Sequence, residues 1–288
     1  MKKIYLIGAT GQLGNDLLIK LKNNYNIHVA DRNLIDLSQP DRLESKLDFS
    51  GYDTVINCAA FHNLTECENH PIEALKCNVF AQEIIARKCK IFNSQYISFS
   101  TDYVFNGQSS IPYSNLSKTS PLQVYGMTRL LGEKVIINQN LKRFIIIRTS
   151  GLFGLKESKT RGKNFLEKCI DQIIKNGHVK VANENKFSPT YTVDLSNAIK
   201  NILISPEIKG IIHLTNLNST SWYEFASYAA KQIKLENKVI PINRNFKAGE
   251  MSRPKYSVLK HSYNSFPNLK MPSWKNAVDR YMRTRLVK

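Results

Sequence analysis

The feature that most constrains this chain is a glycine-spaced run near its start, Gly8-Ala9-Thr10-Gly11-Gln12-Leu13-Gly14. The run follows an apolar segment at 4–7 that predicts a strand, and it opens a segment that predicts a helix. Glycine permits the tight turn between them and lets backbone N–H groups approach a pyrophosphate at the positive end of the helix. A packing turn would explain the glycines, but not the carboxylate of Asp31 at the end of the second predicted strand. Both features together indicate a dinucleotide-binding βαβ unit.

The first half of the chain alternates short apolar or β-branched runs with longer segments whose apolar residues recur at helical spacing. The predicted strands cover 4–7, 27–30, 54–57, 95–100 and 143–148, and the predicted helices cover 13–21, 72–89 and 124–138. This rhythm predicts an α/β fold, a Rossmann-type doubly wound parallel sheet with helices on both faces.

The second half of the chain lacks this regular alternation after about residue 155, and its predicted helices at 165–174 and 222–233 are shorter. We therefore predict a dinucleotide-binding Rossmann domain at 1–154. Residues 155–288 are expected to form mainly a smaller C-terminal substrate-binding lobe, with some segments returning to the Rossmann domain.

The charge of the chain is strongly positive, at +18. The basic residues are dispersed, and no dense Lys/Arg run interleaved with aromatic residues tracks a phosphate backbone, so we do not expect a nucleic-acid partner. The excess positive charge suits small polyanions such as a dinucleotide or a nucleotide diphosphate.

The cysteines and the first residues of the chain indicate the cellular compartment in which the protein is expected. Five cysteines, none in a C-x-x-C pair or at zinc spacing from a histidine, predict free thiols in a reducing compartment. No metal is expected, because Asp16 and Glu184 are lone carboxylates without ligand spacing. The apolar segment at 4–7 is too short for a signal peptide or a membrane span, so we expect a cytoplasmic protein without membrane insertion.

The proposed chemical centre combines Ser100-Thr101-Asp102-Tyr103 with Tyr125. Reduction of a ketone needs a hydride, which a nicotinamide supplies, and a proton, which a tyrosine hydroxyl gives if a nearby cation lowers its pKa. A hydroxyl from Thr101 would hold the carbonyl oxygen. A lone tyrosine on a helix is more often a packing residue, so the whole constellation has to support this interpretation.

With these residues in this order, the sequence resembles the dTDP-4-dehydrorhamnose reductases. That family is a branch of the extended short-chain dehydrogenases that reduces a 4-keto-6-deoxy nucleotide sugar. The resemblance covers nearly the whole chain and rests on motifs in order: 8–14, 56–60, 100–105, 121–126, 132–134, 148–150, 188–191, 252–254 and 257–259, followed by Trp274.

The resemblance implies a role for each matching residue. It places the pyrophosphate on Gly8, Gly11, Gln12, Leu13 and Gly14, the adenosine ribose on Asp31, and Ala59 and Ala60 beside the dinucleotide. It gives the catalytic roles to Thr101 and Tyr125, the sugar site to Asp102 and Tyr103, and the nucleotide end of the substrate to Arg253. NADPH or NADH is the implied cofactor, and Arg32 beside Asp31 leaves the choice open. The implied partner is a nucleotide-diphosphate sugar, and a homodimer stays open.

Three positions depart from the family pattern. Arg129 stands where the family has the lysine that binds the nicotinamide ribose and favours the tyrosinate; a guanidinium keeps the charge but is bulkier, planar and always protonated. Gly151 replaces a tryptophan that packs on the sugar. The pair Glu184-Asn185 replaces Asp-Gln.

Three functions fit these residues. The first is an NAD(P)H-dependent ketoreductase in deoxysugar and polysaccharide precursor biosynthesis, with Tyr125 as acid, Thr101 as orienting donor and Arg129 in place of lysine. The second is a non-catalytic regulatory subunit with the same fold, which Arg129 favours. The third is a related nucleotide-sugar epimerase or dehydratase, because fold alone does not decide the reaction.

Overall fold

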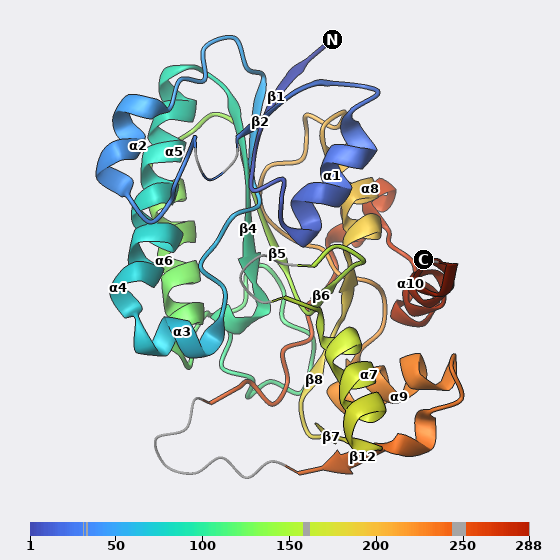
Figure 1. Ribbon diagram of the computed structural model, residues 1–288. Coiled ribbons are helices and arrows are strands. Elements are labelled where there is room, and N and C mark those ends of the chain that lie inside the picture. The colour runs from blue at the N-terminus through green and yellow to red at the C-terminus, as the bar shows by residue number, and fades with distance from the viewer. Residues whose placement is uncertain (31, 33, 158–161, 244–251, 288) are drawn as a thin grey trace.

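A computed structural model describes residues 1–30, 32, 34–157, 162–243 and 252–287 of the chain (Figure 1). At its centre lies a sheet of six parallel strands in the order β2-β1-β3-β4-β5-β10. Their bounds are β1 Lys3–Ile7, β2 Asn26–Ala30, β3 Thr54–Asn57, β4 Gln95–Thr101, β5 Phe144–Thr149 and β10 Gly210–His213. The strand order reverses at β1, which puts the topological switch point at its carboxyl end, where the glycine-rich run begins.

Helices cover both faces of this sheet, as Figure 1 shows. The helices around it are α1 Gln12–Leu21, α2 Pro40–Lys46, α5 Ala81–Ile91, α6 Val124–Asn138 and α8 Thr192–Ile202. Leucines of α1 and α8 share one core with the sheet, and residues of α2, α5 and α6 share another on the opposite face. The predicted Rossmann-type doubly wound sheet is therefore confirmed.

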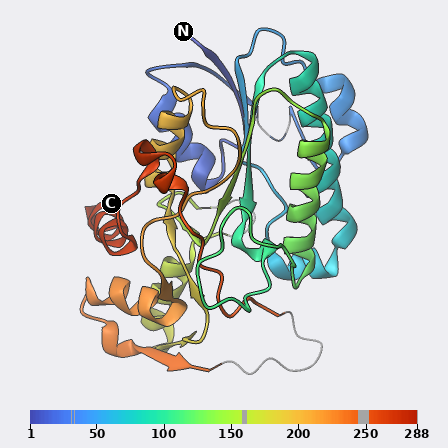
Figure 2. The ribbon, with the colours of Figure 1, turned by 180° about the vertical axis from the view of Figure 1, so that it is seen from behind.

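A smaller lobe lies beyond the carboxyl ends of the strands (Figure 2). It contains α7 Phe165–Asn176, β7 Val179–Ala182, β8 Lys186–Phe187, β11 Thr220–Ser221, α9 Trp222–Lys231, β12 Val239–Ile242 and α10 Trp274–Val287. Its elements form two further apolar clusters, one of which is built largely from aromatic rings. The short strands β6 Leu152–Phe153 and β9 Thr190–Tyr191 pair in parallel beside it.

The structure differs from the predicted elements in several places, and the helices α2 and α10 and the short strands of the second half were not predicted. The predicted helix 72–89 consists of α4 Pro71–Leu75, a π-helical turn at Lys76–Phe80 and then α5, and α3 Leu64–Asn69 precedes it. The strand β10 and the helix α8 were not predicted individually, although both belong to the segments that return to the sheet. Within the part of the chain that the structure describes, no helix is long and apolar enough to cross a membrane.

Candidate active site

The glycine-rich run forms a tight turn between β1 and α1. Gly8 has a φ of +81°, and a Cβ on Gly14 would lie 2.2 Å from the carbonyl oxygen of Gly8. The helix begins at Gln12 after Gly11, which has no side chain with which to cap it. The glycines let the start of α1 pack this closely on the end of β1, and the N–H groups of the first helical turn fit the pyrophosphate of a dinucleotide.

The loop after β3 borders this turn, because a Cβ on Gly8 would lie 2.8 Å from the backbone nitrogen of Ala59. Asn57 Oδ1 accepts a hydrogen bond from Ala59 N at 3.0 Å. Farther on, Asn78 Oδ1 accepts from Phe61 N at 3.0 Å, and Asn78 Nδ2 donates to Phe61 O at 2.8 Å. Two buried amides therefore fix the path of the chain around Ala59 and Ala60, both of them half-buried.

The end of β2 carries the residues expected to select the cofactor. Arg32 is 73% exposed, and its Nε lies 3.6 Å from Asp36 Oδ2, so the guanidinium is open to a ligand. Asp31, expected on the adenosine ribose, lies outside the described residues.

The side chain of Gln12 reaches away from the glycine turn. Its Nε2 donates to the carbonyl oxygens of Gly154 and Lys156, each at 3.2 Å. One turn along α1, Asp16 Oδ2 accepts from Thr192 Oγ1 at 2.5 Å. Gln12 is thus tied by its side chain to the second half of the chain, and only its backbone faces the turn. Leu13 is buried in the core below α1.

The first turn of α6 brings Tyr125 next to the end of β4. A Cβ on Gly126 would lie 2.3 Å from the carbonyl oxygen of Tyr103, so this turn packs directly on the segment after β4. The rings of Tyr103 and Tyr125 meet edge to face at 6.3 Å. The start of the helix is capped by Gln123 Oε1, which accepts from Gly126 N at 3.0 Å, and by Glu68 Oε1, which accepts from Val124 N at 2.8 Å.

Asp102 turns its carboxyl into the protein, although we expected it to line the sugar site. Oδ1 accepts from Thr101 Oγ1 at 3.1 Å and Oδ2 from Ser150 Oγ at 2.7 Å, and the residue is 3% exposed. Burial raises the pKa of this carboxyl to about 6, although hydrogen bonds from Ser257, Ser150 and Thr101 oppose the increase.

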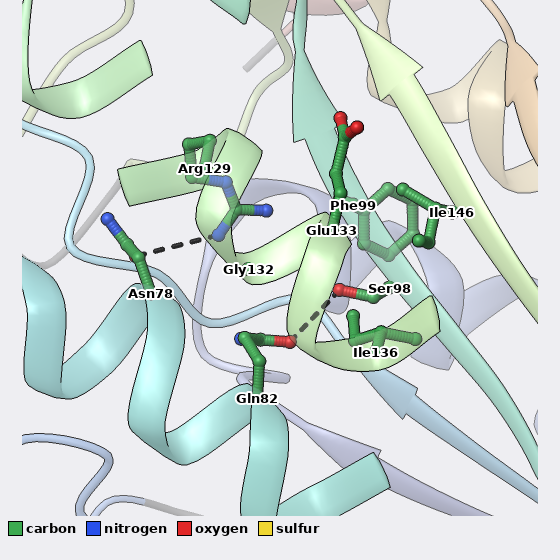
Figure 3. A pocket seen from close by; sticks show the side chains of 9 residues that line it. All are labelled: Asn78, Gln82, Ser98, Phe99, Arg129, Gly132, Glu133, Ile136 and Ile146. Carbon is green, nitrogen blue, oxygen red and sulfur yellow. Dashed lines mark hydrogen bonds between the residues drawn. The ribbon is translucent and has the colours of Figure 1, made fainter. Parts of the chain in front are cut away.

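Arg129 belongs to α6, and its side chain extends toward Asn78 of the π-helical turn (Figure 3). The residue is 6% exposed, and its Nη1 lies 3.5 Å from Asn78 Oδ1, the atom that also holds Phe61. Its Nε has no hydrogen-bond partner among the described residues. Figure 3 shows the guanidinium pointing toward Asn78. The cation one helical turn after Tyr125 therefore contacts the amide that shapes the loop beside the dinucleotide turn.

Glu133 of α6 and Arg148 of β5 form a buried ion pair next to Ser100, the residue before Thr101. Glu133 accepts from Arg148 Nε at 2.8 Å and from Arg148 Nη2 at 2.6 Å, and Ser100 Oγ donates to it at 2.5 Å. Burial lowers the pKa of His213 to about 3, and the positive charge of the neighbouring Arg148 is the second cause. This imidazole is therefore neutral. Neither residue of this ion pair was predicted to have a role in the site, although Glu133 and Arg148 both belong to motifs that carry the family resemblance.

The segment after residue 251 packs against the loop that follows β4. A Cβ on Gly107 would lie 2.6 Å from Pro254 Cα, and Asn185 Nδ2 donates to Pro254 O at 2.9 Å. Arg253 is half-buried here, and its Nε has no partner among the described residues. Asn185, one of the departures from the family pattern, thus holds the backbone next to Arg253.

The space beside Gly151 is filled from another element. Gly151 has a φ of +50°, and a Cβ on it would lie 2.4 Å from Phe187 Cε2. The ring of Phe187 stacks on Trp222 with centroids 3.9 Å apart. A tryptophan here would therefore strain the left-handed backbone and would require the Phe187 ring to move.

The chain matches the family model described as RmlD substrate binding domain over residues 1–286. It is 31% identical to the spore coat polysaccharide biosynthesis protein SpsK of Bacillus subtilis, over 99% of this chain and 98% of that protein. Among solved structures, it superposes on dTDP-4-dehydrorhamnose reductase from Bacillus anthracis in complex with NADP with a TM-score of 0.89 at 28% identity, covering 99% of this chain and 100% of the other. The corresponding reductase of Clostridium acetobutylicum gives a TM-score of 0.90 at 27% identity, with 99% of both chains covered. The resemblance drawn from the motifs is therefore confirmed, and the chain belongs to the RmlD substrate binding domain family.

Proposed function

We propose that this protein is an NAD(P)H-dependent reductase of a nucleotide-linked 4-keto-6-deoxy sugar of the dTDP-4-dehydrorhamnose type, serving deoxysugar and polysaccharide precursor biosynthesis. The observation that carries the proposal is the meeting of Thr101, Tyr103 and Tyr125 at the carboxyl edge of the sheet, beside a glycine turn that fits a pyrophosphate. Relatives named as dTDP-4-dehydrorhamnose reductases, one of them in complex with NADP, support the substrate class and the cofactor.

We assign a separate role in ketone reduction to each of these residues. Gly8, Gly11 and Gly14 form the turn for the dinucleotide, and a bound reduced nicotinamide supplies the hydride. Tyr125 gives its hydroxyl proton to the carbonyl oxygen as that oxygen gains negative charge. Arg129, one helical turn later, supplies the positive charge that favours the resulting tyrosinate, which is the role of lysine in the family pattern.

The sugar site is the part in which this chain departs most from its family. The Phe187 ring fills the space beside Gly151 and is 2% exposed, and we propose that it forms this wall of the sugar site. We propose that Tyr103 lines the sugar and that Arg253 faces the nucleotide end of the substrate. A sugar that differs from dehydrorhamnose fits this changed wall.

The test is oxidation of reduced nicotinamide by the purified protein, with a panel of nucleotide 4-keto-6-deoxy sugars and both cofactors. Tyr125→Phe is expected to lower turnover at least about a hundredfold while cofactor affinity stays within about twofold, because the hydroxyl acts mainly in the transition state. Tyr223→Phe on α9, in the other lobe, is the matched control and keeps normal turnover. Unchanged turnover in Tyr125→Phe would exclude this mechanism. Cofactor binding without turnover on any sugar would favour a regulatory subunit.

Three further proposals concern the protein as a whole. The five cysteines are free thiols, which supports a reducing compartment and therefore the cytoplasm. We retain the division into a dinucleotide-binding domain at 1–154 and a mainly substrate-binding lobe at 155–288, with α8 and β10 as the returning segments. A homodimer stays a prediction, which light scattering of the purified protein tests.

A further inference from the structure

We propose that Asp102 is a positioning residue that sets the direction of the Thr101 hydroxyl, and so decides whether Thr101 donates or accepts a hydrogen bond in the active site. The proposal rests on the reductase function above. It assigns Asp102 an action through Thr101 in place of direct contact with the sugar.

The hydrogen bonds around Thr101 leave little freedom. Thr101 Oγ1 lies 3.1 Å from Asp102 Oδ1, and Tyr103 N donates to the same Thr101 oxygen at 3.2 Å. An ionised carboxylate only accepts, so the single hydroxyl hydrogen of Thr101 points at Asp102. While Asp102 is ionised, Thr101 presents only a lone pair to the site. It then cannot donate to a ketone oxygen, which is the role that the sequence suggested.

Protonation of Asp102 reverses this arrangement. The carboxyl then carries a hydrogen of its own, and one of the hydroxyls around it has to accept in place of donating. When Thr101 accepts, its hydrogen is free to point at the ketone oxygen and to stabilise the negative charge that develops there.

Asp102 is held by three separate segments. Thr101 ends β4, Ser150 follows β5, and Ser257 belongs to the segment that also carries Arg253. That last segment is fixed by Ser257 N, which donates to Lys186 O at 2.8 Å. The carboxyl therefore links the catalytic threonine to the part of the chain that we expect at the nucleotide end of the substrate.

No charged side chain stands among the influences that set the ionisation of Asp102. These are burial, three hydroxyl groups and its own backbone, which place its pKa at about 6. The other ionisable groups on β4, residues 102–105, β5, α6 and residues 252–259 are Tyr96, Tyr103, Tyr125, Arg129, Glu133, Lys134, Arg148, Arg253, Lys255 and Tyr256. Arg148 is already bound to Glu133. The charge of Asp102 thus changes within the range in which the enzyme can be assayed.

The first experiment is the pH profile of kcat/KM between about pH 5 and 8. For the unmodified protein we expect kcat/KM to fall at least about tenfold as pH rises through an ionisation near 6, because the Thr101 hydrogen is withdrawn from the carbonyl oxygen. We call this fall of kcat/KM near pH 6 the bend in the profile. Asp102→Asn is expected to remove the bend and to leave cofactor affinity unchanged. Ser257→Ala moves the bend to higher pH, because a donor that stabilises the carboxylate is lost.

The control is Asp48→Asn, because this exposed carboxyl also accepts from a serine, the backbone nitrogen of Ser50 at 2.8 Å, but lies far along the chain. It should leave the profile unchanged. If Asp102→Asn does not fold, Ser257→Ala carries the test. The proposal is overturned if the bend survives in Asp102→Asn, or if it stays at the same pH in a folded Ser257→Ala protein.

A second measurement separates this proposal from the proposed function. The γ-methyl resonance of Thr101, assigned by its disappearance in Thr101→Ser, should move with pH near 6 in the unmodified protein and stay fixed in Asp102→Asn. A protein without reductase activity that shows this titration would refute the function and keep the coupling. An active protein whose Thr101 methyl does not titrate would refute the coupling alone.

Discussion

The buried pair of Glu133 and Arg148 makes the sharpest prediction about what holds the active site together. The two side chains are 2% and 3% exposed, and both carboxylate oxygens are bound by the guanidinium at 2.8 and 2.6 Å. Glu133→Gln keeps the shape of the side chain and replaces one oxygen with an NH₂ group. In either orientation that NH₂ faces an N–H of Arg148, so donor meets donor in a site closed to water.

The expected loss follows from these contacts. Removing one partner of a buried ion pair costs about 3 to 5 kcal/mol, because the other charge stays buried without compensation. For a chain of this length, about 4 kcal/mol corresponds to a decrease in Tm of about 7 °C. A double variant with Glu133→Leu and Arg148→Met should lose less than Glu133→Gln alone, since no charge is then left in the core.

The assay is urea unfolding followed by circular dichroism, with Glu44→Gln as the matched control. Glu44 binds Arg87 at 2.5 Å, but both side chains are 44% exposed, so its loss should cost less than about 1 kcal/mol. Equal small losses for Glu133→Gln and Glu44→Gln would refute the reasoning, because they would mean that burial adds nothing to the first pair.

Two further predictions concern the cofactor side of the site. Arg129→Lys keeps a positive charge one turn after Tyr125 but loses the contact with Asn78, so turnover should stay within about tenfold of the unmodified protein; a large gain, measured in the same nicotinamide assay, would show that Arg129 does not support catalysis. If Arg32 contacts the 2′-phosphate of NADPH, as we propose from its exposed guanidinium, Arg32→Ala should weaken NADPH binding about tenfold with little effect on NADH. Equal effects on both cofactors, measured by fluorescence titration, would argue against that contact.

Local patterns predicted the core of the fold well. The strand 54–57 and the helix 124–138 have the predicted bounds, because apolar periodicity acts over a few residues. The strand β10 escaped prediction because it is a four-residue run that pairs with β5 more than sixty residues earlier in the chain. The π-helical turn escaped as well, since its residues also fit a regular helix.

In the candidate site, too, the sequence indicated which residues take part but not the directions of their side chains. Motifs in order indicated Thr101, Tyr103 and Tyr125, which the structure brings together. The direction of a side chain depends on neighbours far away in sequence. Asp102 turns inward because Ser150 and Ser257 meet it there, and Arg129 reaches Asn78 because the π-helical turn presents that amide. Sequence spacing carries no signal for either contact.

The fastening of α1 to the second half of the chain bears on how the protein is made. The helix after the glycine turn packs on α8 and is held by Thr192, and the sheet is completed by β10. The six-stranded sheet can therefore be completed only after the ribosome has synthesised the chain as far as His213. Until then the part of the α1 surface that α8 covers in the folded protein is exposed, so an incomplete chain carries apolar surface that favours aggregation.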